Sequence, residues 1–381
     1  MKIFYWSPFL SKIATINAVI RSIQSIKKYD KSKRFDPYII DSVGEWSSLD
    51  CNNDEIKIIK IFKKNTYKIL PKGSYLKSRF SQISIFFLSF FSLKELILRE
   101  KPDFFIAHLI ISLPLLLFNI FNFDTKLIIR ISGTPKLNFV RKYFWKLLSN
   151  KIHKVTCPTI TSYKKLVEYN IFEKRKLEIL YDPIININEI NKKKHEPIDE
   201  KFKDYNFILG IGRLTKQKNF KLLINAFNEI LKKESDLKLI ILGEGEQRND
   251  LEHMIKKLNL IEKVFLPGYK KNVYNYIYNS NCVITSSLYE DPGFVLLEAG
   301  FLNKIVLASD SKTGPSEIIN NSKRGFLYKN KNYHDLASKF LEYNSSNYSQ
   351  NFYKKLNLKY YTKNFTLFNH YKKLNSILTK N

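Results

Sequence analysis

The chain has three cysteines, Cys51, Cys157 and Cys282, with neither the close spacing of a zinc site nor the density of a disulfide framework. Its six histidines contain no pair such as HExxH, so the sequence predicts no protein-bound metal. No GxGxxG motif follows the first apolar run, which excludes a dinucleotide-dependent oxidoreductase. Scattered cysteines are typical of a reducing compartment, and we therefore expect a cytoplasmic protein.

Acidic residues are scarce relative to basic ones. Lysine plus arginine number 64, against 35 for aspartate plus glutamate, which gives a formal net charge of +29. Such a charge favours a polyanionic partner, either nucleic acid or an anionic membrane. The chain is also rich in lysine, asparagine and isoleucine, the residues of AT-rich codons. Genome composition therefore explains the excess equally well.

No uninterrupted apolar run reaches the roughly 20 residues of a membrane-spanning helix. Segment 83–98 is broken by serine, lysine and glutamate, and segment 109–123 by proline and asparagine. We interpret both as buried core helices. The alternative for the first is a helix lying on a membrane, aromatic side down, beside Lys72, Lys77 and Arg79.

Short β-like runs alternate with helical patterns in both halves of the 381-residue chain, which predicts an α/β protein with two parallel, helix-covered sheets. The expected strands are 2–6, 38–43, 104–108, 126–131, 154–158, 177–181, 207–211, 238–242, 264–266, 282–286, 305–309 and 325–328. A polar, lysine-rich stretch separates the two series. We therefore predict a first Rossmann-like domain over 1–185, a linker over 186–205, a second Rossmann-like domain over 206–350 and C-terminal helices over 351–381.

Residues 289–299 carry the strongest chemical signal, because they place Glu290 and Glu298 on either side of the helix start expected at Pro292-Gly293. A helix N-terminus favours phosphate. If the whole interval were helical, the two carboxylates would lie about 12 Å apart along the axis. That is wider than the roughly 5 to 10 Å of a glycosidase acid pair. The spacing suits the two ends of a nucleotide-sugar, although an isolated pair is more simply two solvated glutamates.

The surrounding residues favour the nucleotide-sugar interpretation over two solvated glutamates, because several further motifs occur together in a fixed order along the chain. They are Gly212-Arg213-Leu214 with Lys218-Asn219, Gly243-Glu244-Gly245, the Phe-Leu-Pro-Gly run at 265–268, Ser309-Asp310 and the Gly-Pro-Ser-Glu run at 314–317. With them, residues 207–328 resemble the donor-binding domain of retaining GT-B glycosyltransferases of the family 4 type. The resemblance implies two Rossmann-like domains facing each other across a cleft. It also implies an acceptor-binding first domain and a C-terminal helix that crosses back to it.

In that family the positions of Arg213 and Lys218 bind the donor's phosphates, and Glu290 faces the transferred sugar. Transfer requires a diphosphate to leave with negative charge while positive charge builds on the sugar ring. Arginine and lysine then take the place of a metal. The resemblance therefore implies Glu290, Arg213 and Lys218 as catalytic residues.

The resemblance also implies a set of donor-binding residues. They are Gly212, Gly268, Tyr269, Gly293, Phe294, Val295 and Glu298, the last on the ribose hydroxyls. For Gly268 and Tyr269 an ordinary strand-to-helix turn is the alternative. Many relatives have Phe-Gly where this chain has Pro292-Gly293, which leaves the amide donors open.

The first domain departs from the family pattern. Ser7-Pro-Phe-Leu-Ser-Lys12 stands where relatives have a glycine-rich loop. His108, at the end of an expected strand, either contacts the acceptor or sugar or is a hydrogen-bonded core histidine. Ser132 and Gly133 are further candidates for acceptor or sugar contacts.

The expected function is that of a metal-independent, retaining, hexosyltransferase-like enzyme without a cofactor. It takes a sugar from a UDP- or GDP-linked donor to a glycan acceptor, lipid-linked, in the biosynthesis of bacterial surface polysaccharide such as lipopolysaccharide, O-antigen or capsule. We expect it in the cytoplasm, peripheral on the inner face of the plasma membrane and attracted to its anionic surface. The alternative is a polyanion- or nucleic-acid-binding protein with a decayed donor site. No nucleic-acid-binding motif is visible, so we expect no nucleic acid partner.

Overall fold

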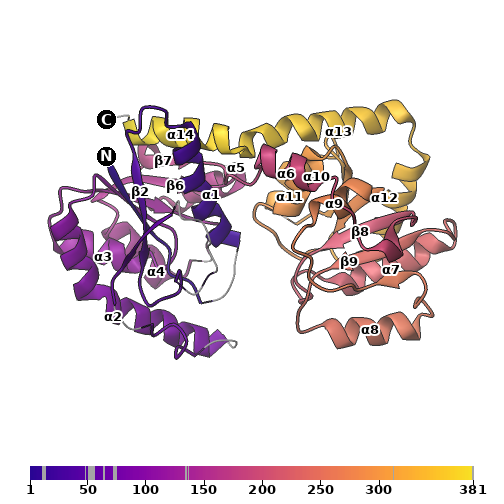
Figure 1. The fold of residues 1–381 in the computed structure, drawn as a ribbon, viewed down its shortest axis with the longest axis horizontal. Helices are drawn as coiled ribbons and strands as arrows, with labels where there is room; N and C mark the ends of the chain where they lie inside the picture. Colours follow the sequence, from indigo (N-terminus) through magenta and orange to yellow (C-terminus); the bar gives the residue numbers. More distant parts are fainter. Residues whose placement is uncertain are drawn as a thin grey trace. The chain divides into compact units, whose positions relative to one another are not determined.

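The computed structural model describes residues 1–10, 14–47, 49, 56–62, 65–71, 75–133, 135, 137–311 and 313–379. The chain forms two compact units, each with its own sheet and core (Figure 1). The first comprises Met1–Pro183 with Leu367–Asn381, and the second comprises Ile184–Thr366.

The sheet of the first unit has seven parallel strands in the order β3-β2-β1-β4-β5-β6-β7. The strands are β1 (Lys2–Trp6), β2 (Asp36–Asp41), β3 (Lys57–Lys60), β4 (Phe104–Ala107), β5 (Lys126–Arg130), β6 (Ile152–Cys157) and β7 (Leu177–Ile179). The helices are α1 (Ala14–Tyr29), α2 (Tyr75–Glu100), α3 (Ser112–Ile120), α4 (Phe139–Leu147), α5 (Ile160–Tyr169), the short η1 (Lys174–Lys176) and α14 (Leu367–Thr379). Continuous apolar runs such as that of β4 are typical of strands buried on both faces.

Helices cover both faces of this sheet. α1 and α14 lie side by side on one face, where Val19, Ile23 and Leu374 are buried in one core cluster (Figure 1). α2 to α5 supply the cluster on the other face. The C-terminal helix α14 is therefore part of the first unit, although the residues directly before it in sequence belong to the second unit.

The sheet of the second unit has six parallel strands in the order β10-β9-β8-β11-β12-β13. The strands are β8 (Phe207–Ile211), β9 (Lys238–Leu242), β10 (Val264–Phe265), β11 (Cys282–Thr285), β12 (Ile305–Ser309) and β13 (Phe326–Tyr328). The helices are α6 (Ile187–Lys193), η2 (Glu200–Phe202), α7 (Phe220–Leu231), α8 (Arg248–Lys257), α9 (Tyr274–Asn279), α10 (Phe294–Phe301), α11 (Gly314–Ile319), α12 (Tyr333–Ser345), α13 (Tyr348–Thr362) and η3 (Lys363–Phe365).

All twelve expected strands are confirmed to within two residues at each end. The sequence missed β3, because its four residues, Lys-Ile-Ile-Lys, are too few to show alternation and are partly or fully exposed. Residues 186–205, expected as a linker, contain α6 and η2 and pack on the second unit. The Phe202 ring lies 5.4 Å from that of Phe265, and the Asn272 side chain donates to the Lys193 carbonyl at 2.9 Å.

The apolar segment 83–98 lies within α2, which is 26 residues long because polar neighbours extend it on both sides. Length and composition alone would let Leu76–Glu100 cross a membrane, but 33% of its most apolar window is buried in the protein. Ile85, Leu93 and Ile97 on the inner face belong to the core of the first unit. The outer face exposes large apolar residues, so the core-helix interpretation describes one face of α2 and the surface interpretation the other.

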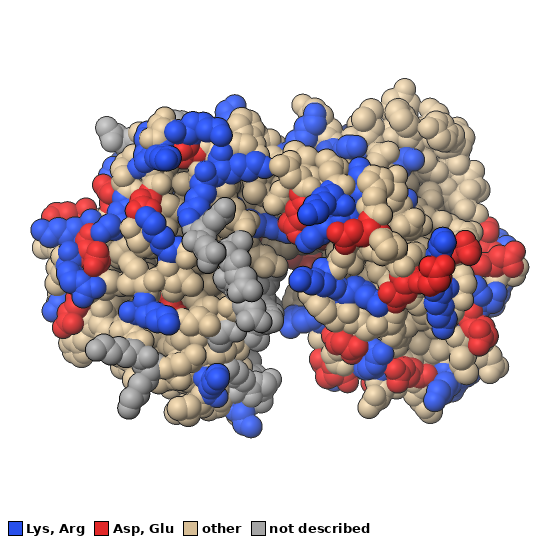
Figure 2. All heavy atoms as spheres, in the orientation of Figure 1, with Lys and Arg blue, Asp and Glu red and all other residues tan. Residues whose placement is uncertain are grey.

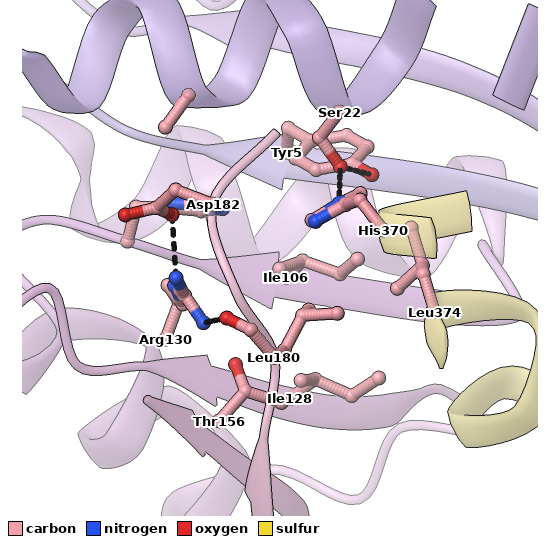
Figure 3. A pocket seen from close by; sticks show the side chains of 12 residues that line it. Tyr5, Ser22, Ile106, Ile128, Arg130, Thr156, Leu180, Asp182, His370 and Leu374 are labelled. Carbon is pink, nitrogen blue, oxygen red and sulfur yellow. Dashed lines mark hydrogen bonds and ion pairs between the residues drawn. The ribbon is translucent and has the colours of Figure 1, made fainter. Parts of the chain in front are cut away.

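A series of buried hydrogen bonds joins α14 to the rest of the first unit (Figure 3). The His370 Nδ1–H donates to the Tyr181 carbonyl at 2.7 Å, because a carbonyl only accepts. His370 Nε2 then accepts from the Ser22 hydroxyl of α1 at 2.9 Å, and Ser22 accepts from the Tyr5 hydroxyl of β1 at 3.0 Å. This pattern requires a neutral imidazole. Burial is the main cause that lowers the pKa of His370 to about 3.

We expect the free energy of unfolding to fall as the pH drops below about 6.5, because the unfolded chain protonates His370 there while the folded chain resists until about pH 3. One proton corresponds to a slope of about 1.4 kcal/mol per pH unit. The variant His370→Asn should reduce this slope by about one proton, as measured by urea unfolding at a series of pH values. His334→Asn, which removes an exposed histidine of α12, is the control. An unchanged slope in His370→Asn would contradict the neutral buried histidine.

Candidate functional site

The second sheet has a topological switch point between β8 and β11. These strands are neighbours, but the chain continues from β8 toward β9 on one side and from β11 toward β12 on the other. Ligands in parallel α/β sheets bind at the carboxyl ends of the strands at such a point. The loops that follow the two strands, 212–219 and 286–293, contain all three predicted catalytic residues and, of the donor-binding set, Gly212 and Gly293.

Hydrogen bonds tie these two loops together. The Ser286 hydroxyl donates to the Lys218 carbonyl at 2.8 Å, and the Leu288 N–H donates to the Gln217 carbonyl at 2.8 Å. The Gln217 side-chain amide donates to the Tyr289 carbonyl at 3.0 Å. These bonds hold together two segments that lie about 70 residues apart in sequence.

Lys218 and Glu290 form an ion pair across the two loops. Their side chains are only 20% and 14% exposed. The Ser287 hydroxyl also donates to Glu290 Oε1 at 2.8 Å, while the Glu290 carbonyl accepts from the Gly314 N–H at 3.1 Å and from the Thr313 hydroxyl. A cation and a carboxylate predicted from separate motifs are thus brought together and fixed in place.

Glycines allow this close packing of loops. A Cβ at Gly243 would lie 1.9 Å from the Gly212 carbonyl oxygen, and one at Gly212 would lie 3.1 Å from Lys218 Cδ. Glycine at these positions therefore lets the loop after β9 approach the loop after β8, and lets the Lys218 stem pass over the backbone. Arg213 follows Gly212 and is exposed, and no ion pair between described residues engages its guanidinium.

α10 begins at Phe294, directly after the predicted Pro292-Gly293 break. Gly293 has φ +106°, a conformation that side chains disfavour. The first helical N–H groups, those of Phe294 and Val295, have no carbonyl partner within the helix and point outward at its positive end. Because only 294–301 is helical, Glu290 lies in the preceding loop, and the axial separation of about 12 Å does not describe the two glutamates.

Glu298 lies within α10 and accepts from the Tyr274 hydroxyl of α9 at 3.4 Å. The Gly268 carbonyl accepts from the Gly243 N–H at 2.9 Å, so the turn after β10 has a structural role. Tyr269 beside it is 74% exposed. The structural turn at Gly268 is compatible with a contact of Gly268 and Tyr269 to the donor's base, and that contact stays a prediction. The sequence offered no signal for Ser287 or Tyr274, because neither stands in a motif.

The first unit has a groove of about 1310 Å³ at its own switch point, between β1 and β4. The loop after β1 contributes Pro8 and Phe9 to its lining. His108, which follows β4, and Ser132 and Gly133, which both follow β5, all line this groove. The three candidate acceptor or sugar contacts are therefore brought together, although their role stays a prediction.

His108 is buried, as a core histidine would be, but its Nδ1 has no hydrogen-bond partner among the described residues. Burial, with the positive charge of Arg130 second, lowers its pKa well below the ordinary value, so the ring is neutral. Arg130 itself is buried and pairs with Asp182 at 2.5 Å (Figure 3). All four residues of the motif Arg130-Ile-Ser-Gly133 line the groove, and the sequence did not indicate that Arg130 would be buried and paired with Asp182.

Among the described residues, no group of three or more histidine, cysteine, aspartate or glutamate side chains is placed to hold a metal ion. The expectation of a metal-independent reaction stays a prediction.

The close approach at Gly243 gives a test of the site's architecture. We expect Gly243→Ala to lower the free energy of unfolding by about 1 to 3 kcal/mol, because the added methyl meets a backbone carbonyl that cannot rotate away. Gly210→Ala is the control, since its methyl would meet only side-chain carbons, at 3.0 Å or more. Chemical denaturation measures both, and an equal or smaller loss in Gly243→Ala would contradict the packing of these loops.

Part of the chain, including this site, is similar to known glycosyltransferases. Residues 191–364 match the family model described as glycosyl transferases group 1. Over 246 residues the chain is 32% identical to an uncharacterised glycosyltransferase of Methanocaldococcus jannaschii, covering 58% of this chain and 59% of that protein. Over 220 residues it is 35% identical to an N-acetylgalactosamine-N,N'-diacetylbacillosaminyl-diphospho-undecaprenol 4-alpha-N-acetylgalactosaminyltransferase of Campylobacter jejuni, covering 56% and 58%. The chain thus matches less than two thirds of the length of these curated relatives.

The fold extends the likeness to the whole chain. An Anabaena protein crystallised with UDP and glucose superposes with a TM-score of 0.71 at 15% identity, over 100% of both chains. With the two parallel, helix-covered sheets, this likeness confirms the predicted GT-B fold class. Within that fold, the match to the glycosyl transferases group 1 model covers residues 191–364, which include Lys218, Glu290 and α10.

Proposed function

We propose that this protein is a glycosyltransferase that moves a sugar from a nucleotide-sugar to a glycan acceptor in bacterial surface-polysaccharide biosynthesis. The observation that carries the proposal is the Lys218–Glu290 pair, fixed at the switch point beside the loop that leads into α10. Cation, carboxylate and free helix amides are the groups that a diphosphate-linked sugar needs. The family of residues 191–364 supports the same reaction class.

In this proposal the donor's diphosphate replaces Glu290 as the partner of Lys218. Arg213, exposed and outside the ion pairs of the described residues, binds the phosphates together with the N–H groups of Phe294 and Val295. Glu298 accepts from the ribose hydroxyls, with the Tyr274 hydroxyl orienting its carboxylate. Gly268 and Tyr269 contact the base. The Anabaena structure contains UDP, which supports a UDP-linked donor, with a GDP-linked donor as the alternative.

The proposed reaction breaks the bond between the anomeric carbon and the diphosphate oxygen and joins that carbon to the acceptor's hydroxyl oxygen. The nucleoside diphosphate leaves with the bonding electrons, and the hydroxyl proton passes to its phosphate. Attack on the face that the diphosphate leaves retains the configuration. Glu290 stabilises the positive charge that builds on the ring, and Lys218 and Arg213 stabilise the leaving group in place of a divalent ion.

The acceptor is proposed to be lipid-linked. The Campylobacter relative is named for a diphospho-undecaprenol substrate. The exposed outer face of α2 carries Leu76, Phe80, Phe87 and Phe91, each more than half exposed. A helix with a buried inner face and such an outer face suits the surface of a membrane. We therefore place the enzyme in the cytoplasm, peripheral on the inner face of the plasma membrane.

The polyanion-binding alternative has weaker support. Figure 2 shows basic side chains spread over both units, with acidic side chains among them, and not gathered into one patch of the visible face. The net charge of +29 is the only feature in its favour, and genome composition accounts for that charge equally well.

Arg213→Ala tests the donor site. Loss of a charge-assisted contact to phosphate should weaken UDP or GDP binding about tenfold or more, as measured by calorimetry. Lys216→Ala, which removes an exposed lysine of the same loop, is the matched control and should bind nearly as wild type does. Equal losses in both variants would contradict the donor site. Steeply salt-dependent binding of oligonucleotides, with no preference for a nucleotide, would instead favour the polyanion-binding alternative.

We expect substitutions of the two glutamates to affect different steady-state parameters. Glu290→Gln should lower kcat about 100-fold with little change in KM for the donor, because the carboxylate acts on charge that develops in the transition state. Glu298→Gln should raise that KM instead, because it weakens a contact made throughout. If Glu290→Gln changed only KM, the proposed role of Glu290 would be wrong.

A further inference from the structure

The Glu290 carboxylate has two side-chain partners among the described residues, and only one of them is a cation. Lys218 pairs with Oε1, and the Ser287 hydroxyl donates to the same oxygen at 2.8 Å. The Glu290 side chain is 14% exposed, so water reaches it poorly. A carboxylate in such a place needs a hydrogen-bond donor, because an unpaired charge withdrawn from water costs several kcal/mol.

Ser287 is itself held in place by the end of β12. It is 2% exposed, and its carbonyl accepts from the hydroxyl of Ser309, which is 1% exposed. This contact gives the serine of the Ser309-Asp310 motif a role, since it fixes the residue that holds Glu290. The Ser287 hydroxyl therefore faces the Glu290 carboxylate from a backbone that the neighbouring strand supports.

The start of α11 fixes the backbone of Glu290 in a similar way. The Glu290 carbonyl accepts from the Gly314 N–H at 3.1 Å and from the Thr313 hydroxyl. A Cβ at Gly314 would lie 1.7 Å from the Pro292 carbonyl oxygen, so the helix start approaches this loop closely only with glycine. The loop is thus supported at both Ser287 and Glu290, and neither support involves Lys218.

Donor binding would remove the cation from this arrangement. In the proposed function the diphosphate takes Lys218 away from Glu290, and the Ser287 hydroxyl is then the remaining side-chain donor among the described residues. A hydrogen bond to an ionised acceptor is stronger than one between neutral groups, and its loss matters most when no other partner remains. The Ser287 hydroxyl therefore contributes more to the loaded site than to the empty one.

We propose that Ser287 is a positioning residue of the transfer reaction, which holds the Glu290 carboxylate in place while the donor's diphosphate occupies Lys218. Ser287 acts through Glu290 and contacts neither the phosphates nor the reacting atoms. The inference rests on the proposed function and deepens it, because it names the group that lets the lysine leave its carboxylate. Ser309 and the start of α11 support that group from behind.

The probe is UDP, or GDP if the chain binds it more tightly, because each carries the diphosphate without a sugar. Ser287→Ala should weaken nucleotide binding to the full chain about tenfold in calorimetry, since Lys218 then leaves a carboxylate without a hydrogen-bond donor. Ser311→Ala is the matched control. Ser311 is a buried serine after β12 whose hydroxyl has no partner among the described residues, so this variant should bind as wild type does.

The background Glu290→Ala separates a positioning role from support of the loop itself. Without the carboxylate there is nothing for the hydroxyl to hold, so adding Ser287→Ala should change the nucleotide Kd less than about twofold. A tenfold loss in both backgrounds would show that Ser287 supports the loop, and would overturn the proposal. Wild-type affinity in Ser287→Ala would overturn it as well.

A crystal structure of the wild-type protein with UDP or GDP gives a reading that needs no variant. We expect Lys218 on the diphosphate and the Glu290 carboxylate still within hydrogen-bonding distance of the Ser287 hydroxyl. A carboxylate turned away from Ser287 in that complex would contradict the positioning role.

The wild type also keeps this test apart from the proposed function. If it bound neither UDP nor GDP, the donor site and the transferase proposal would fail together. If it bound a nucleotide that Arg213→Ala weakens, while Ser287→Ala had no effect, only the positioning role would be rejected.

Discussion

The ion pair between Lys218 and Glu290 is the interaction around which the second unit's site is arranged. Both side chains are largely withdrawn from water, and withdrawing charges costs solvation that a single pairing seldom repays in full. The pair is therefore poorly explained as a source of stability. It is better explained as a binding site whose charged groups are already in position. In the proposed function, a ligand's phosphate binds the lysine and its sugar lies against the carboxylate.

In both sheets the candidate site lies at a topological switch point. Neighbouring strands whose connections run in opposite directions leave a gap at their carboxyl ends, at β8 and β11 in one unit and at β1 and β4 in the other. What fills each gap differs. Glycines 212 and 243 let backbone and lysine pack tightly in the second unit, whereas Pro8 and Phe9 line a wide groove in the first, in which no aspartate or glutamate is among the described lining residues.

The sequence predicted the parts of the structure that local pattern determines. Buried parallel strands read as apolar runs, and Gly293 marks the start of α10 because few other residues adopt its backbone angles. Contacts between distant segments were not predictable in the same way. Nothing in the sequence near Arg130 indicates that Asp182 neutralises it. For α2, composition gave the apolar content but not which face the core would cover, because apolar residues occur all around the helix.

The central claim is that charge stored at the second switch point receives an activated sugar. The most direct test is a crystal structure of the protein with a nucleotide-sugar bound. The account predicts the diphosphate within hydrogen-bonding distance of Lys218, Arg213 and the first N–H groups of α10, with the Glu290 carboxylate turned toward the sugar. A diphosphate bound elsewhere, with the Lys218–Glu290 pair left intact, would contradict it.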